Sequence, residues 1–243
     1  MSSFLANGHA VLLHVYDAPA GVPEGVQLVD AATTLQRRHL FRMKGSNSVA
    51  GFADWFRFQL LHDQGGVWVD TDVVCLKPLA YPQPEVFGWQ DQNTINVAVL
   101  GLPAGHELAR WMVECWHHPD RLLPYDPPRR RRHKLLRRLR PGDSRPYIEW
   151  GEFGPYGFTL AARHLGYERL ALPYWHFYPI GYDNWHTIFD DTLRDNPHLT
   201  EASCALHLWN EMARREPGFD KNGPFPPGSL FEQLCARYLK TDS

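Results

Sequence analysis

An apolar run bounded by two glycines on one side and two acids on the other constrains the fold more than any other segment. The glycine pair 65–66 precedes the apolar run 67–69, and Asp70 and Asp72 follow it directly. Carboxylates at the end of a buried strand are costly unless a cation meets them. In extended backbone, residues two apart point the same way. We therefore expect an oxygen-rich site for a hard divalent cation, Mn²⁺ or Mg²⁺. The alternative is a pair of solvated acids at a turn.

The residues before the glycine pair predict a helix over 46–62, because apolar side chains recur there at helical spacing. Asp54 and Arg57 are three residues apart, so they share one face of this helix. Only the glycine turn separates the helix from the strand expected over 67–70, which brings that face near the acids. The alternative is an ordinary intrahelical ion pair on a solvated surface.

The order of helix and strand predicts an α/β layer structure. We expect one domain over residues 1–243. Further strands are expected over 11–16, 26–29, 86–90, 95–100 and 205–208, further helices over 106–116, 154–165 and 229–239, and irregular loops over 173–185.

Composition excludes several classes of protein. The 243 residues carry a formal net charge of −2, so the protein has no overall positive charge that would favour binding of nucleic acid. The four cysteines have neither zinc-like spacing nor a disulfide framework, and we expect reduced thiols in a cytoplasmic protein. The N-terminal residues do not form a signal peptide, and no stretch approaches the roughly 20 apolar residues of a spanning helix.

A basic insertion over about 127–141 interrupts this ordinary composition. Its Arg-rich run, 129–140, carries Leu135, Leu136 and Leu139 at helical spacing. We expect a basic amphipathic helix with a peripheral membrane contact at the inner face of the membrane. A solvated helix or disordered loop is the main alternative, and nucleic-acid binding is a weaker one.

The segments 52–61 and 65–72 together resemble the core block of DXD-containing glycosyltransferases. The resemblance is closest to the family 32-type enzymes, which include capsular polysaccharide transferases and mannosyl- and α-1,4-galactosyltransferase-like enzymes. It implies a GT-A fold, a Rossmann-like sheet with helices on both faces that binds a nucleotide sugar. The usual first strand of this fold precedes the segment that resembles residues 3–9, so we expect a GT-A sheet that lacks it.

The resemblance also implies roles for the four central residues. Asp72 coordinates the metal directly, and Asp70 contacts the ribose or sugar and reaches the metal through water. Asp54 accepts hydrogen bonds from donor-sugar hydroxyls. Arg57 contacts the sugar and the diphosphate, where its planar donor fork suits phosphate oxygens.

Weaker matches suggest four more site residues. His207 either completes the set of metal ligands or is a core histidine whose ring is hydrogen-bonded within the protein. Asn96 faces the donor sugar, and Trp209 stacks on the donor or packs in the core. Glu152 is expected to contact the acceptor or the developing cation, although an acid near a helix start is already favoured by the helix dipole.

The implied function is a metal-dependent glycosyltransferase that moves a sugar with retention from a nucleotide sugar to a glycan or lipid-linked glycan in surface polysaccharide synthesis. An alternative is a catalytically inactive GT-A domain that serves as a glycan- or nucleotide-binding subunit. A metal-dependent phosphohydrolase is a third alternative, disfavoured by the two linked transferase-type motifs.

Overall fold

The computed structural model describes residues 1–192 and 199–239. Its helices are α1 (Ser2–Ala6), α2 (Ala50–Gln64), α3 (Glu107–His117), α4 (Pro128–Arg138), α5 (Pro155–Leu165), α6 (Asn210–Arg215) and α7 (Leu230–Tyr238). Its strands are β1 (Val11–Val15), β2 (Val26–Asp30), β3 (Gly66–Val69), β4 (Val73–Cys75), β5 (Val86–Trp89), β6 (Ile95–Leu102) and β7 (Ala205–His207). The expected α/β class is confirmed, and the expected elements are present with ends shifted by a few residues.

The strands form three small sheets where one continuous sheet was expected. β6 lies between β3 and β5 in an antiparallel sheet, β1 pairs in parallel with β2, and β4 pairs antiparallel with β7. The chain turns at residues 71–72, so β4 leaves the central sheet and meets β7 instead. All eight residues of β6 are buried, as expected for a strand covered on both faces.

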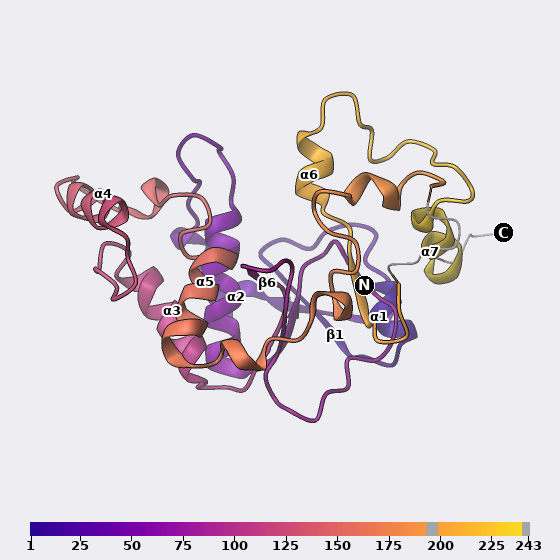
Figure 1. Cartoon of the computed structure of the whole chain (residues 1–243), viewed down its shortest axis with the longest axis horizontal. Helices are drawn as coiled ribbons and strands as arrows, with labels where there is room; N and C mark the ends of the chain where they lie inside the picture. The colour runs from indigo at the N-terminus through magenta and orange to yellow at the C-terminus, as the bar shows by residue number, and fades with distance from the viewer. Residues whose placement is uncertain (193–198, 240–243) are drawn as a thin grey trace.

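Helices α2, α3 and α5 pack together beside β6 and cover one face of the central sheet (Figure 1). Phe58 of α2 and Phe158 of α5 stack there with ring centroids 5.9 Å apart. The core on the opposite side of the sheet is built by the aromatic-rich segment 173–189, an irregular stretch with 3-10 turns that buries Phe177 and Tyr178 completely. The short helices α1, α6 and α7 also contribute buried side chains to it.

Strand β6 belongs to both hydrophobic cores. Val97 and Leu100 pack in the core beneath the three helices, whereas Ala98 and Val99 pack in the core beneath the irregular segment. Sharing one strand joins the two cores. No helix in the described ranges is both long and apolar enough to cross a membrane.

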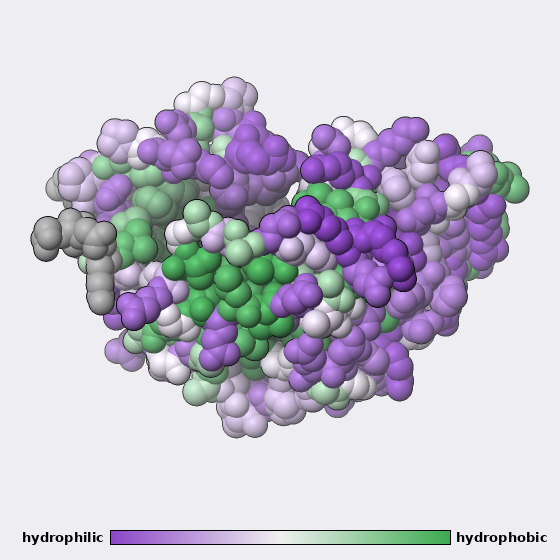
Figure 2. Space-filling model, turned by 180° about the vertical axis from the view of Figure 1, so that it is seen from behind, coloured by the Kyte–Doolittle hydropathy of each residue, from purple (hydrophilic) through white to green (hydrophobic). Residues whose placement is uncertain are grey.

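A cavity of about 570 Å³ is lined by residues of β1, α2 and β3. Leu12 of β1, Phe56 of α2 and Val67 of β3 are among the residues that line it. Figure 2 shows a broad group of hydrophobic residues in the middle of the face seen from behind. Within the described residues, β1 pairs with β2 and makes no hydrogen-bonded pairing with β3.

Candidate active site

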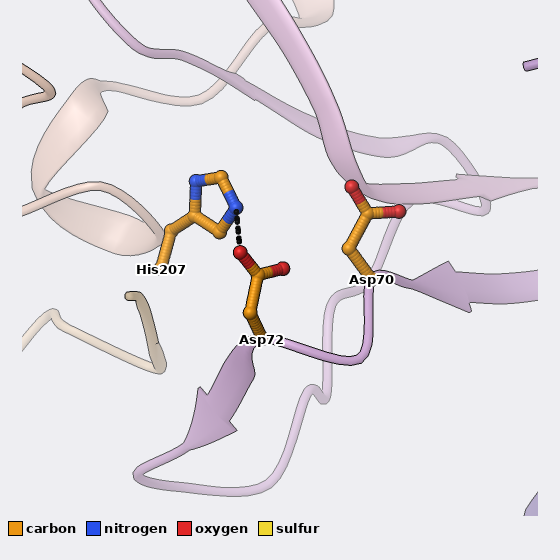
Figure 3. A group of neighbouring side chains, drawn as sticks. All are labelled: Asp70, Asp72 and His207. Atoms are coloured by element: carbon orange, nitrogen blue, oxygen red, sulfur yellow. Dashed lines mark ion pairs between the residues drawn. The ribbon is translucent and has the colours of Figure 1, made fainter. Parts of the chain in front are cut away.

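The acidic motif occupies a tight turn at the end of β3. The backbone N–H of Asp70 donates to the carbonyl of Ala98 at 2.8 Å, which extends the pairing of β3 with β6 by one residue. The N–H of Val73 then donates to the carbonyl of Asp70 at 3.1 Å, so the chain reverses between the two acids. The shared face expected from extended backbone is thus replaced by a turn, which still brings both carboxylates to one side (Figure 3).

Asp70, Asp72 and His207 form a group that fits a divalent cation. One ligand atom from each lies within 4.8 Å of the others (Figure 3). His207 ends β7, and the pairing of β7 with β4 places it opposite Val73, beside the turn. Two carboxylates and an imidazole are a donor set suited to Mn²⁺-class metals. The structure therefore brings together the three residues expected to hold the metal.

The electrostatics of Asp72 favour its ionised form. Burial acts to raise the pKa of this carboxyl, but hydrogen bonds from His207 and from the backbone N–H of Asn210 outweigh burial and keep the pKa below its usual value. The His207 Nε2 atom lies 3.3 Å from Oδ2 of Asp72, and the Asn210 N–H lies 2.9 Å from the same oxygen. The His207 Nδ1 atom is buried without a hydrogen-bond partner.

Arg57 joins the helix to the acidic turn. It is 5% exposed, and its guanidinium donates to Asp70 Oδ1 at 2.9 Å and to the carbonyl of Val97 at 2.8 Å. The same guanidinium lies 3.6 Å from Asp54 Oδ1. This burial excludes the alternative of a solvated intrahelical pair. The glycine turn therefore brings the Asp54–Arg57 face to Asp70, as the sequence predicts.

Trp68 also belongs to the candidate site, although the sequence motifs did not indicate it. Its indole N–H donates to Asp70 Oδ1 at 2.6 Å, and the Arg57 guanidinium carbon lies 5.1 Å from its ring centroid. Trp68 lies on β3, and Asp70 continues the strand pairing by one residue, so the alternation of side chains along extended backbone was a signal that placed both on one face.

Asp54 lies in an environment that favours its neutral form. Burial is the main cause that raises the pKa of its carboxyl; Arg57 opposes the rise, Asp70 adds to it, and the resulting pKa is about 7. Gly154 packs against this carboxyl so closely that an added Cβ would lie 2.9 Å from Oδ2. Asp54 and the loop 149–154 together line a cavity of about 140 Å³.

The structure places Glu152 away from solvent, which contradicts its expected contact with an acceptor. Both carboxylate oxygens accept hydrogen bonds from Arg137, at 2.8 and 2.9 Å, and Lys134 lies 3.7 Å away. The side chain has no exposed surface. Glu152 instead anchors the loop 149–154 to α4, because two buried cations neutralise it.

Asn96 and Trp209 are also held by the protein itself. The Asn96 amide donates to Gln90 at 2.7 Å and accepts from the N–H of Ala98 at 2.8 Å. The Trp209 indole N–H donates to the carbonyl of Ile180 at 2.8 Å, and the ring is 7% exposed. Both side chains lie near the turn but pack in the core, so stacking of a donor on Trp209 needs a rearrangement.

Two further features near the metal group were not expected. Trp209 has a φ of 54°, a backbone conformation that is uncommon for a residue with a side chain and that concentrates at functional sites. It precedes α6, whose first residue, Asn210, supplies the N–H to Asp72. The hydroxyl of the buried Tyr178 accepts from the N–H of Val99 at 3.2 Å, beside His207. Neither contact has a local sequence signal.

Comparison with known proteins gives two family matches on either side of the basic insertion. Residues 30–96 match the model described as "Glycosyltransferase sugar-binding region containing DXD motif". Residues 148–241 match the "Alpha 1,4-glycosyltransferase conserved region". The first match contains the turn and Arg57, and the second contains His207, so the two matched regions meet at the metal group.

The chain is similar to lactosylceramide 4-alpha-galactosyltransferases of several mammals. It is 27% identical to those of Pongo pygmaeus and Homo sapiens over 192 residues, which is 78% of this chain and 78% and 48% of the two relatives. It is likewise 27% identical to that of Mus musculus over 201 residues, 47% of that relative. The chain thus spans about half the length of the human and mouse relatives. No solved structure matches it.

Proposed function

Because the chain belongs to the DXD-containing glycosyltransferases, a class of hexose-transferring enzymes with a GT-A-like fold, we propose that it is a metal-dependent hexosyltransferase acting on a glycolipid or lipid-linked glycan. The donor is a nucleoside diphosphate hexose, and transfer retains the anomeric configuration. The observation that carries the proposal is the group of Asp70, Asp72 and His207 beside the buried guanidinium of Arg57. The names of the relatives support a glycolipid acceptor and an α linkage.

Asp72 and His207 would hold a Mn²⁺ or Mg²⁺ ion, with Asp70 at the edge of the same group. When bound, such a cation neutralises the charge that develops on a diphosphate leaving group. Asp72 is suited to this position because its hydrogen bonds keep it ionised at neutral pH. The turn and the pairing of β4 with β7 fix the three side chains before any ligand arrives, which lowers the cost of reorganisation.

Arg57 and Trp68 position the donor side of the site. Both donate to Asp70 Oδ1, which leaves Oδ2 of that carboxylate for a ribose or sugar hydroxyl. Arg57 also lies between Asp70 and Asp54, whose carboxyl faces a small cavity and can exchange hydrogen bonds with sugar hydroxyls. The guanidinium is buried and already holds Val97, so we assign it to positioning these carboxylates more than to direct diphosphate contact.

In the proposed reaction, the acceptor oxygen forms a bond to the anomeric carbon while the bond from that carbon to the diphosphate oxygen breaks. The acceptor proton passes to an oxygen of the departing diphosphate. No dedicated carboxylate base is needed on the acceptor side. The burial of Glu152 agrees with this scheme because it removes the carboxylate once expected there.

We further propose that the protein works in the cytoplasm, at the inner face of the membrane, in surface polysaccharide synthesis. Two features of the chain support this location. All four cysteines are free thiols, as is usual in a reducing compartment. The basic helix α4 also lies at one end of the molecule, where it is open to an anionic surface (Figure 1).

The proposal is tested by incubating the protein with a panel of nucleoside diphosphate hexoses, a glycolipid acceptor and either Mn²⁺ or a chelator. We expect nucleoside diphosphate release with one donor, stimulated by acceptor and abolished by chelator. The product linkage should keep the α configuration of the donor, which is measured from the proton NMR coupling constant of the anomeric hydrogen. If a donor binds but neither hydrolysis nor transfer occurs, the alternative of a catalytically inactive binding subunit replaces the proposal.

A further inference from the structure

Helix α4 has the reverse of the usual amphipathic arrangement. Its cationic residues Lys134 and Arg137 are buried, with exposed fractions of 0% and 4%. Its leucines face solvent instead, because Leu135, Leu136 and Leu139 at its end are 47%, 51% and 80% exposed. A surface helix of a soluble domain normally shows the opposite pattern. The exposed leucines therefore need an explanation.

Buried ion pairs fix this orientation. Lys134 Nζ donates to Asp126 Oδ2 at 2.8 Å, and Arg137 donates to Asp120 at 2.7 Å and to both oxygens of Glu152. Rotating α4 to bury the leucines would break these ion pairs. The charges would then be exposed or would stay buried without a partner, at a large cost in folding free energy. The outward direction of the leucines is thus built into the structure.

The outward face of α4 combines the leucines with free cations. Arg132, Leu135, Leu136 and Leu139 are spaced three or four residues apart, so they share one side of the helix. Arg131 is exposed beside them, and in the described part of the chain neither its guanidinium nor that of Arg132 makes a hydrogen bond or ion pair. At the right end of Figure 2, which corresponds to the α4 end in Figure 1, hydrophobic residues lie next to hydrophilic ones.

We infer that this face of α4 docks on an anionic lipid surface, with Leu135, Leu136 and Leu139 in the acyl boundary and Arg131 and Arg132 among the headgroups. A helix that combines an apolar stripe with arginines binds such an interface through apolar burial plus attraction to anionic lipid. The eleven residues of α4 are too few to span a bilayer, so the helix lies in the plane of the surface. Unpartnered arginines favour a negatively charged partner over a second copy of this chain, which would bring like charges together.

The docked helix is rigidly joined to the candidate active site. Glu152 binds α4 through Arg137, and it belongs to the loop 149–154 that packs through Gly154 against Asp54. Docking through α4 would therefore hold the site at a fixed place above the membrane that carries a lipid-linked acceptor. This consequence rests on the proposed function, whereas lipid binding itself does not.

The inference is tested by sedimentation of the whole protein with vesicles of phosphatidylcholine, with and without phosphatidylglycerol, and without nucleotide sugar. We expect binding only to the anionic vesicles, weakened by salt. A triple variant, Leu135→Ser, Leu136→Ser and Leu139→Ser, should bind at least about tenfold more weakly. The matched control Leu239→Ser, at a leucine that is 55% exposed on another helix end, should bind like wild type.

A second variant, Arg131→Glu with Arg132→Glu, should also lose binding to anionic vesicles while its thermal unfolding stays close to that of wild type. Equal binding by the triple variant and wild type, or no binding by wild type, would overturn the inference. A wild-type dimer in light scattering that the triple variant loses would assign the face to self-association instead. An Asp72→Asn variant should bind vesicles normally, so loss of transfer and loss of docking are separable.

Discussion

Replacing Arg57 by methionine removes the cation on which three parts of the candidate site converge. The guanidinium is buried and bonds to Asp70 and to the carbonyl of Val97, with Asp54 at 3.6 Å. Breaking a buried pair by removing one partner costs about 3–5 kcal/mol. Because 28% of the Asp70 side chain is exposed, solvent reduces this cost, and we expect ~3 kcal/mol from Arg57→Met. For a domain of this size, that lowers Tm by about 6–12 °C.

The assay is urea unfolding of the protein in chelator, followed by tryptophan fluorescence. Arg57→Lys keeps the charge but not the planar donor fork, so we expect a loss of about 1–2 kcal/mol. In the Asp70→Asn background, the effect of Arg57→Met should shrink by about 1–3 kcal/mol, because the partner charge is gone. The matched control is Arg163→Met, which breaks the half-exposed pair with Glu168 and should cost less than about 1 kcal/mol.

Two outcomes would contradict a buried, coupled pair of Arg57 and Asp70. One is a free energy of unfolding for Arg57→Met within about 1 kcal/mol of the Arg163→Met control, since a buried pair should exceed an exposed one. The other is an unchanged effect of Arg57→Met when Asp70 is already asparagine, which would show that the two side chains are not coupled.

Three other changes probe separate parts of the site. His207→Gln should weaken Mn²⁺ binding by at least about tenfold in calorimetry, because an imidazole ligand is lost, and unaltered affinity would remove His207 from the metal group. The KM for donor should rise as pH falls below about 7, since Asp54 then gains a proton and accepts hydrogen bonds poorly. Asp54→Asn should lose this pH dependence, and its persistence would assign the titration elsewhere. Glu152→Gln should lower the free energy of unfolding by about 3 kcal/mol or more, because Lys134 and Arg137 lose a buried counter-charge, while donor KM stays near wild type. A wild-type melting curve would contradict the anchoring role.

The sequence predicted that Asp54, Arg57 and Asp70 lie together because these residues are close along the chain. Asp54 and Arg57 share a helix face, the glycine turn is short, and Asp70 follows the strand immediately. Local periodicity therefore determined most of the geometry. Trp68 could have been added by the same reasoning, since it lies two residues before Asp70.

The sequence could not predict features that depend on distant pairing. His207 reaches Asp72 only because β7 pairs with β4, and Asn210 supplies its N–H only because the chain takes a left-handed conformation at Trp209. The role of Glu152 was misjudged because its partners, Arg137 and Lys134, come from a basic run that looked solvent-exposed. The division into three sheets likewise depends on where β4 goes after the turn.

Metal-dependent transfer at the acidic turn is measured directly by nucleoside diphosphate release in Mn²⁺ by wild type, Asp72→Asn and the matched control Asp63→Asn. Asp63 is a half-exposed acid in the last turn of α2, outside the metal group. We expect turnover by wild type and the control, and a loss of about a hundredfold or more for Asp72→Asn at a temperature where both variants remain folded. Equal turnover by Asp72→Asn and wild type, or wild-type turnover that persists in chelator, would contradict a metal-dependent transfer at this turn.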